Sequence, residues 1–304
     1  MKTDNILVSV IIPTYSRPDN ICRAIDSVLA QTYKAIEIIV VDDNGEGTPH
    51  QLETAKVLDD YIKQEKIIYL KHEVNKNGSA ARNTGFKASQ GAFVTFLDDD
   101  DEMLPEKIEK QVDAIQQLHD EKYAMAYCGC VVDKKGSINK FPTVGSGNFC
   151  NELLLGKWKM GSGSNLLIRR DAVNYIGGYD ESFARRQDIE FTIRLFRHYN
   201  IVEVHDFLLI KHNDSTPKRP LAKNYICIIE HFLNTFNGDI LSMSHNLGNQ
   251  VYYDQYMRLA FLAANEPDYN ILIKSVQKAS AYHVVSFYDS LRLVWNVLIK
   301  PNKR

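Results

Sequence analysis

The chain has 304 residues, of which 44% are hydrophobic and 24% charged, and these proportions exclude a disordered or fibrous protein. Its 36 basic and 38 acidic residues give a formal net charge of -2, so no overall positive field attracts nucleic acid. The five cysteines lack zinc-site or disulfide spacing, the N-terminus lacks signal-peptide features, and no apolar run approaches the roughly 20 residues of a membrane-spanning helix. We therefore expect a cytoplasmic protein.

Apolar, β-branched runs alternate with segments of helical periodicity in the first half of the chain. The runs are residues 7–12, 36–41, 67–70, 93–97 and 124–130, and helices are expected near residues 18–29, 50–63, 79–89 and 105–119. This alternation predicts a doubly wound α/β domain with a mostly parallel sheet. We expect this domain to span residues 1–215, followed by a C-terminal helical extension at residues 216–304. Within the domain, Lys134-Lys135-Gly136 predicts the tip of a hairpin.

Polar side chains follow three of the expected strands at their carboxyl ends. Residues 13–17 follow the first strand, residues 42–45 follow the second, and residues 98–101 follow the fourth. Ligands of open α/β sheets bind beyond the carboxyl ends of the strands, which meet at one edge. The functional site is therefore expected at this edge.

Four consecutive aspartates, Asp98–Asp101, give the strongest of these signals. Carboxylates so close together repel one another, so full ionisation is costly unless a positive charge lies among them. Their oxygens suit Mg²⁺ or Mn²⁺, which bind through one or two carboxylates plus substrate phosphates. The alternative is that acidic residues cap a helix before Pro105, as Asp101 and Glu102 could do. We favour the metal interpretation for the first three aspartates.

The pair Asp42-Asp43 ends the second expected strand and precedes Asn44-Gly45. One carboxylate could form a turn by bonding its own backbone. The other interpretation is an acceptor for a base or ribose, as acidic residues are in other nucleotide-binding α/β folds. The nearby acidic cluster favours the second interpretation.

Residues 8–15 read VSVIIPTY, residues 39–43 read IVVDD, residues 77–85 read NGSAARNTG, and residues 96–101 read FLDDDD. In this order and at these strand ends, the four segments resemble the family 2 glycosyltransferases over residues 7–212. The resemblance implies the GT-A fold, a Rossmann-like fold of nucleotide-diphospho-sugar transferases.

The resemblance also implies a donor site. In this family, the segment matching residues 13–15 cradles the nucleoside, and an aspartate matching Asp42 or Asp43 contacts the base. The helix start matching residues 78–83 lines the nucleotide, with Arg82 facing the base or diphosphate. The expected donor-site residues are Pro13, Thr14, Tyr15, Arg17, Asp42, Asp43, Gly78, Arg82, Asn83, Asp98 and Asp99.

The same resemblance places a divalent cation, Mn²⁺ or Mg²⁺. Asp98 and Asp100 match the D-x-D element of the family, whose last member usually holds the metal while the first lies nearer the ribose. The middle position is Asp99, where many relatives have serine. His212 resembles a histidine that closes the metal site in some relatives, and the alternative is an exposed loop histidine.

Asp188 is the candidate catalytic base. Residues 177–183 resemble the glycine-rich turn of the family, and Gln187-Asp188 resembles its "E-D" element, with glutamine in place of the usual glutamate. Inverting transfer needs a carboxylate that removes the proton of the acceptor hydroxyl. The alternative is that Asp188 is the N-cap of a helix beginning at Ile189.

A stripe of apolar residues near the C-terminus precedes Lys300, Lys303 and Arg304. It could rest on anionic lipid, or it could pack on the catalytic body or a second subunit, and we favour packing. The stripe consists of Val284, Tyr288, Leu291, Trp295 and Leu298.

These patterns give the hypothesis of a metal-dependent, inverting glycosyltransferase of the bacterial surface-polysaccharide type. The expected partners are a nucleoside-diphosphate sugar, with uridine the usual nucleoside of the family, and a saccharide or lipid-linked saccharide acceptor. Thymidine or guanosine donors, a homo-oligomer and peripheral contact with the inner face of the cell membrane stay open. The alternatives are a sugar-phosphate nucleotidyltransferase and a non-catalytic nucleotide-sugar-binding module.

Overall fold

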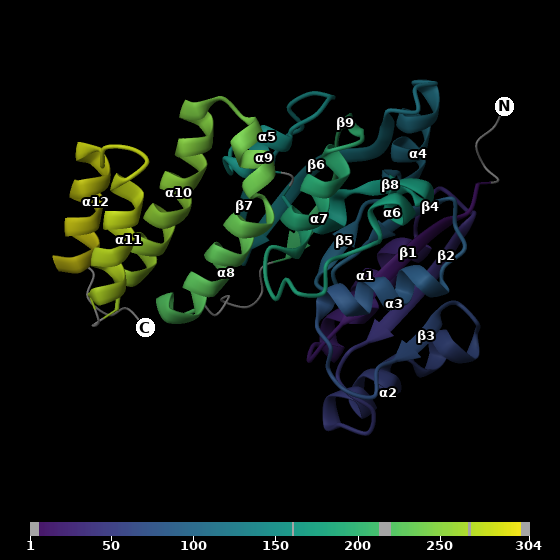
Figure 1. Ribbon diagram of the computed structural model, residues 1–304. Helices are drawn as coiled ribbons and strands as arrows, with labels where there is room; N and C mark the ends of the chain where they lie inside the picture. Colours follow the sequence, from purple (N-terminus) through teal and green to yellow (C-terminus); the bar gives the residue numbers. More distant parts are fainter. Residues whose placement is uncertain (1–5, 160, 213–219, 267–268, 299–304) are drawn as a thin grey trace. The chain divides into compact units, whose positions relative to one another are not determined.

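The computed structural model describes residues 6–159, 161–212, 220–266 and 269–298 (Figure 1). Its contacts divide the chain into two compact units. The first unit comprises Met1–Cys150 and Lys159–Thr216, and the second comprises Asn151–Trp158 and Pro217–Arg304.

The first part of the sheet in the first unit is parallel. Strand β1 (Val8–Thr14) lies between β2 (Ile36–Asp42) and β4 (Phe93–Phe96), and β3 (Ile68–Lys71) pairs with the outer side of β2. Strands β1 and β2 are almost entirely buried, as expected where helices cover both faces of a parallel sheet. These four strands coincide with the first four apolar runs, so the parallel α/β prediction is confirmed.

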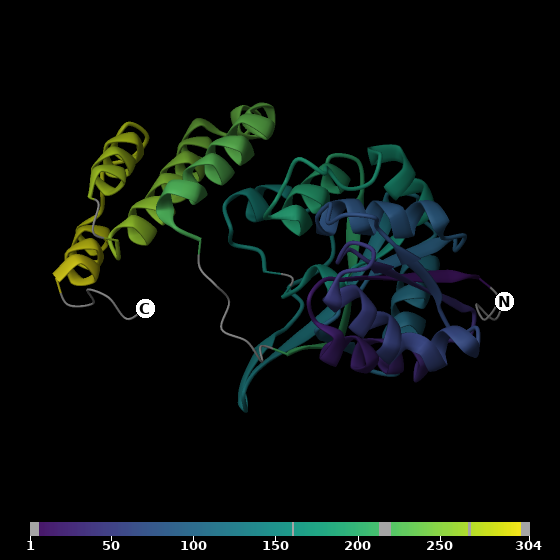
Figure 2. The same cartoon turned by 90° about the horizontal axis from the view of Figure 1, so that it is seen from below.

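Successive side chains of a strand point to opposite faces of the sheet. Strand β1 therefore packs against a different helix on each face. Ile12 packs in the core with α1 (Pro18–Leu29), whereas Ile11 lies against Gly85 of α3 (Gly78–Ala88). Figure 2 shows helices on both sides of the sheet in the first unit. Because α3 lies close to β1 and β2, its first turn reaches the carboxyl ends of these strands.

The remaining strands extend the sheet with mixed directions. Strand β8 (Leu167–Arg169) is antiparallel to β4 and to β6 (Tyr123–Lys134). Strand β9 (Asn200–His212) is parallel to β6. Strand β5 (Asp101–Met103) is antiparallel to β9. The order in this nine-stranded sheet of the described residues is β3-β2-β1-β4-β8-β6-β9-β5, and β7 (Ser137–Phe141) forms the predicted hairpin with β6. The β5–β9 pairing places the end of the acidic cluster beside β9.

Four further helices belong to the first unit. Helix α4 is amphipathic, with Ile108, Val112 and Ile115 in the core, and α7 buries both aromatic and aliphatic side chains. These two helices therefore have an apolar face that packs inward, whereas α2 buries Leu58 together with the polar Gln51 and Thr54. The four helices are α2 (Pro49–Lys63), α4 (Lys107–Gln117), α6 (Arg170–Ile176) and α7 (Gln187–Phe196).

Three aromatic rings fix α7 near the end of β4. Tyr179 and Phe191 stack with ring centroids 4.0 Å apart, and Phe96 contacts both rings edge-on at 5.0 and 5.8 Å. All three side chains are buried. This cluster ties α7 to the strand that leads into the acidic cluster.

The second unit is helical, as the sequence predicts from residue 216 onward. Its interior includes Phe232 and Phe236, whose centroids lie 5.0 Å apart, and a small cluster of Tyr253, Met257 and Ala279. Among the described residues, no helix is both long enough and apolar enough to cross a membrane. The helices are α5 (Cys150–Leu154), which begins at the end of the first unit, α8 (Ala222–Thr235), α9 (Asn237–Ser242), α10 (His245–Ala263), α11 (Asn270–Ser280) and α12 (Phe287–Leu298).

Replacing Gly85 with alanine tests the close contact of α3 with β1. A Cβ atom at this position would overlap Cγ2 of Ile11 and lie 3.2 Å from Cγ2 of Val41. We expect Gly85→Ala to lower the free energy of unfolding by about 1–3 kcal/mol despite the better helix propensity of alanine. Denaturant unfolding measures this change. Lys87→Ala, on the exposed side of the same helix, should change it by less than about 0.5 kcal/mol, and equal effects would contradict the close packing.

Candidate active site

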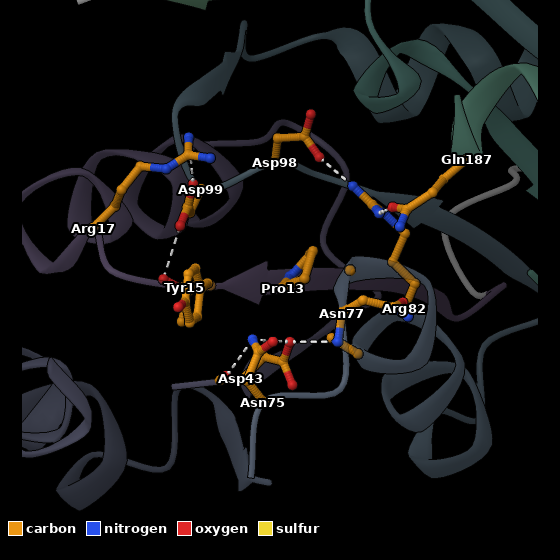
Figure 3. Close-up of a pocket in the computed structure, with 13 residues that line it drawn as sticks. Pro13, Tyr15, Arg17, Asp43, Asn75, Asn77, Arg82, Asp98, Asp99 and Gln187 are labelled. Atoms are coloured by element: carbon orange, nitrogen blue, oxygen red, sulfur yellow. Dashed lines mark hydrogen bonds and ion pairs between the residues drawn. The ribbon is translucent and has the colours of Figure 1, made fainter. Parts of the chain in front are cut away.

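A cavity of about 360 Å³ lies at the carboxyl edge of the parallel strands, between the ends of β1, β2 and β4 and the first turn of α3 (Figure 3). The strand ends bring together segments that are distant in sequence, as the open-sheet rule predicts. The cavity is lined by Pro13, Thr14, Tyr15, Arg17, Asp43, Asn75, Asn77, Gly78, Ala81, Arg82, Asp98, Asp99 and Gln187.

The turn after β1 forms one wall of the cavity. Tyr15 lines the cavity and is 53% exposed, so it is an aromatic residue that a ligand can reach. Ser16 adopts a left-handed φ of 57°, and its backbone N–H donates to Asn44 Oδ1 at 2.7 Å. This bond to the turn after β2 fixes the direction in which Tyr15 and Arg17 leave the strand.

The two adjacent aspartates at the end of β2 have different surroundings. Asp42 is fully buried and does not line the cavity, since its carboxylate accepts from the Tyr69 hydroxyl at 2.6 Å and from Asn44. Asp43 does line the cavity (Figure 3). Of the two positions that the sequence leaves open for a base contact, Asp43 is therefore the one at the cavity.

Asp43 also holds the loop before α3. Its carboxylate accepts from the backbone N–H groups of Lys76 and Asn77 at 2.8 and 2.9 Å, from Asn75 Nδ2 at 2.8 Å, and from His72 Nδ1 at 2.6 Å. Asn77 then caps α3 by accepting from Ser79 and Ala80. His72 and Asn75 are not among the predicted site residues, because single polar residues carry no recognisable pattern. Asn77 begins the NGSAARNTG segment, but the prediction for that segment starts at Gly78.

Each member of the acidic cluster has a cationic neighbour. Arg82 Nη2 donates to Asp98 Oδ1 at 2.6 Å. Arg17 contacts both Asp100 and Asp99, with its Nη1 atom 3.1 Å from Asp99 Oδ1. The repulsion expected among consecutive aspartates is thus offset by two arginines that line the cavity.

The pKa values of these carboxyl groups shift in different directions, because burial raises each one and the neighbouring cations lower it to different extents. Burial raises the pKa of Asp99 to about 7, although Arg17 and the Thr14 hydroxyl at 2.8 Å oppose the rise. Burial alone would also raise the pKa of Asp98, but the charges of Arg82 and Lys211 bring it below the ordinary value. The cluster therefore holds at least one carboxylate whose ionised form is favoured.

Asp101 lies in β5 instead of capping a helix. It is fully buried, and its Oδ2 accepts from the hydroxyls of Ser162 and Ser164, both at 2.6 Å. Burial raises the pKa of Asp101 to about 6, and Lys211, 3.7 Å away, opposes this rise. The helix-cap alternative for Asp101 and Glu102 is wrong, because α4 begins at Lys107, after both have paired with β9.

The end of β9 presents Lys211, rather than His212, to the acidic cluster. Lys211 pairs with Asp101 across the strands, and His212 Nε2 lies 2.9 Å from Glu102 Oε2. Among the described residues, no three histidine, cysteine or acidic side chains gather as a ready-made metal site. His212 is therefore engaged with a strand neighbour and is not one of the cavity residues.

Asp188 lies in the first turn of α7, where Arg186 and not Asp188 occupies the N-cap position, so the N-cap alternative is wrong. Its Oδ1 accepts from the N–H of Ile189 at 2.9 Å. Burial and then the negative charge of Asp98 raise the pKa of Asp188, against the opposing effects of Ile189 N–H and Arg82. Such a carboxylate is a stronger proton acceptor than an exposed one.

Arg82 joins the acidic cluster to α7. Besides Asp98, it donates to Gln187 Oε1 at 2.9 Å (Figure 3). Its guanidinium carbon also lies 5.4 Å from the centroid of the Tyr179 ring. The neighbouring Asn83 does not line the cavity. It exchanges hydrogen bonds with the backbone of Tyr179 at 2.8 and 2.9 Å, and so holds the turn that precedes α7.

Comparison with known proteins identifies the family of this arrangement. The model of the family described as "Glycosyl transferase family 2" matches residues 9–177, more than half of the chain. An uncharacterized glycosyltransferase of Rickettsia conorii is 34% identical over 231 residues, which are 73% of this chain and 37% of that protein. The GalNAc(5)-diNAcBac-PP-undecaprenol beta-1,3-glucosyltransferase of Campylobacter jejuni is 34% identical over 134 residues, 44% of this chain and 41% of that protein. The chain thus spans less than half the length of both relatives.

Solved structures show the same GT-A fold. TarS residues 1–349 from S. aureus, in complex with UDP-GlcNAc, superposes with a TM-score of 0.63 at 16% identity, covering 98% of this chain and 93% of that chain. The mannosyltransferase PcManGT from Pyrobaculum calidifontis, in complex with GDP-Man and Mn²⁺, superposes with a TM-score of 0.55 at 16% identity, covering 99% and 89%. The GT-A fold predicted from the sequence is confirmed.

Replacing Asp43 with asparagine tests its role in holding the loop before α3. The amide NH₂ would face N–H donors that now share a carboxylate. We expect Asp43→Asn to lower the free energy of unfolding by about 1.5–3 kcal/mol and to speed hydrogen exchange at the amides of Lys76 and Asn77. Glu46→Gln, at an exposed position between β2 and α2, should change neither the free energy of unfolding nor the exchange at these amides. Unchanged exchange in Asp43→Asn would refute the role of Asp43 in holding the loop.

Proposed function

This chain belongs to glycosyl transferase family 2, and we propose that it transfers a sugar from a nucleoside-diphosphate sugar, with UDP as the nucleotide, to an acceptor hydroxyl with inversion. The observation that carries the proposal is one cavity lined by Asp43, Arg17, Arg82, Asp98 and Asp99. Helix α7 adjoins it, since Gln187 lines the same cavity and Asp188 is the next residue of that helix. Groups suited to a base and a diphosphate thus line one space, and a carboxyl group suited to proton transfer lies on the adjoining helix.

The donor is proposed to lie along the strand ends. Tyr15 offers an exposed ring to the nucleoside base, and Asp43 lies beside it at the end of β2. Arg17 and Arg82 suit the diphosphate, because guanidinium groups bind phosphate oxygens in pairs. The complexes of TarS with UDP-GlcNAc and of PcManGT with GDP-Man support a nucleotide-sugar ligand for this fold.

A divalent cation, Mg²⁺ or Mn²⁺, is proposed to be held by Asp98 and Asp100. Their oxygens are the hard donors that these ions take. The absence of three gathered ligands in the described residues fits an ion that takes its other ligands from a diphosphate. Bound there, the ion would neutralise charge on the departing diphosphate. The complex of PcManGT with Mn²⁺ supports a divalent cation as a ligand for this fold.

Asp188 is proposed to accept the proton of the acceptor hydroxyl. Inversion requires that the hydroxyl oxygen attack the anomeric carbon from the face opposite the nucleotide, so the base must come from an element outside the nucleotide-binding strand ends. Helix α7 is such an element, and Arg82 ties it to Asp98 through Gln187. The raised pKa of Asp188 strengthens it as a base.

The acceptor is proposed to be a saccharide or lipid-linked saccharide in the synthesis of a cell-surface polysaccharide. The printed name of the Campylobacter jejuni relative describes a glucosyltransferase that acts on an undecaprenol-linked glycan. That relative matches 44% of this chain, and this likeness supports an acceptor of the same chemical class.

A panel of UDP-, dTDP- and GDP-sugars tests the proposed reaction. We expect release of nucleoside diphosphate from a UDP-sugar, stimulated by Mn²⁺ and lost in EDTA. Asp100→Asn should reduce this stimulation by at least about tenfold, because it removes a proposed ligand. Asp19→Asn, an exposed change in α1, serves as the matched control. Release of pyrophosphate from a nucleoside triphosphate and a sugar phosphate would instead establish a nucleotidyltransferase.

Replacing Asp188 with asparagine tests the assignment of the base. We expect kcat to fall about 10²–10⁴-fold while the dissociation constant for UDP changes less than about threefold. In the unchanged protein, activity should fall on the acid side with a midpoint above the ordinary carboxyl pKa of about 3.9, because the pKa of Asp188 is raised. Asp171→Asn removes an exposed carboxylate as a control. Full turnover in Asp188→Asn would exclude Asp188 as the base.

A further inference from the structure

Helix α12, labelled in Figure 1, presents an apolar face that no other described part of the second unit covers. None of its residues is buried. The sequence favours packing of this stripe, yet its side chains are between 52% and 90% exposed. The exposed apolar residues, hereafter the α12 face, are Val284, Phe287, Tyr288, Leu291, Val294, Trp295 and Leu298.

The opposite side of α12 is the side that packs. Asp289 Oδ2 accepts from the Tyr253 hydroxyl of α10 at 2.7 Å, and the Arg292 guanidinium lies 4.2 Å from the centroid of the Phe261 ring. Leu293 packs against the cluster of Tyr253, Met257 and Ala279. The helix is therefore held through contacts that include its charged residues, while a continuous apolar row at three- and four-residue spacing faces outward. A helix of an ordinary soluble surface has the reverse arrangement.

Charge is distributed unevenly between this region and the rest of the chain. Residues 269–304 contain six basic residues and one acidic residue, Asp289, although the whole chain has a formal net charge of -2. The remaining residues 1–268 therefore carry a net charge of -7. Three of these basic residues, Lys300, Lys303 and Arg304, follow the apolar row in the sequence.

We propose that the α12 face docks on an anionic lipid bilayer, with the helix lying in the plane of the interface. Three aromatic side chains, Phe287, Tyr288 and Trp295, occupy the exposed row, and rings of this kind favour the headgroup boundary. The concentrated positive charge is complementary to anionic headgroups. The same charge disfavours pairing this face with the face of a second copy, which would bring two positive segments together.

This inference is independent of the proposed reaction, because binding to lipid can be measured without donor or acceptor. If both proposals hold, the chain lies at the surface where a lipid-linked acceptor is found.

Vesicle binding of the full chain tests the inference. We expect co-sedimentation with vesicles of phosphatidylglycerol and phosphatidylcholine, much weaker binding to phosphatidylcholine alone, and weakening in 0.5 M salt. The chain has two tryptophans, and Trp158 is buried while Trp295 is 52% exposed. A blue shift of tryptophan fluorescence on binding is therefore assigned to Trp295.

Leu291→Asp should weaken binding to the anionic vesicles by about tenfold or more, since it places a negative charge within the α12 face. Leu241→Asp, at a 70% exposed position of α9, is the matched control and should bind as the unchanged chain does. Circular dichroism and sugar-nucleotide turnover without vesicles confirm that both variants are folded.

Three results would overturn the proposal. They are no sedimentation of the unchanged chain with anionic vesicles, equal losses in the two variants, or a dimer in sedimentation equilibrium that Leu291→Asp dissociates without any vesicle binding. In the unchanged chain, turnover without vesicle binding would refute this inference alone, whereas vesicle binding without turnover would refute the proposed function alone.

Discussion

Repulsion among four consecutive carboxylates is the constraint on which the site depends. Asp98 is stabilised by Arg82, Asp99 and Asp100 by Arg17, and Asp101 lies nearest Lys211. These cations come from α3, from the turn after β1 and from β9, which are far apart in sequence. The acidic cluster can exist at the end of β4 because the sheet order gathers all three around it.

In the proposed reaction, Arg82 connects the site of the diphosphate with the helix that carries the catalytic base. Arg82 divides its donors between Asp98 and Gln187, so a negatively charged diphosphate would compete for a guanidinium that also positions α7. The residue at position 187 therefore affects how strongly Arg82 is held away from a diphosphate. The glutamate usual in relatives would be a charged competitor for Arg82, whereas Gln187 is a neutral acceptor. The charge near Asp188 then comes chiefly from Asp98, the largest charge contribution to its raised pKa.

The parallel strands and the cavity could be predicted because their signals are local: β-branched runs end at Pro13, Asp42 and Asp98, and the fold places such ends together. The choice between Asp42 and Asp43 as the cavity residue could not be predicted from the sequence. It depends on which side chain faces Tyr69 and which faces the loop of residues 75–77. Likewise, the choice between Lys211 and His212 depends on the β5–β9 register. Strand β9 also carries irregular pairing with β6, and no residue pattern reveals such shifts.

The apolar stripe of α12 shows a second limit of sequence patterns. A repeat of three and four residues predicts that one face of a helix is apolar, but the repeat is the same whether that face meets protein or lipid. The contacts of the other face show which side of α12 packs within the second unit, and they leave the apolar face outside that packing. With Asp289 bonded to Tyr253 and Arg292 stacked on Phe261, rotating the apolar row inward would break both interactions. The polar contacts of α12 therefore keep its apolar side available for another surface.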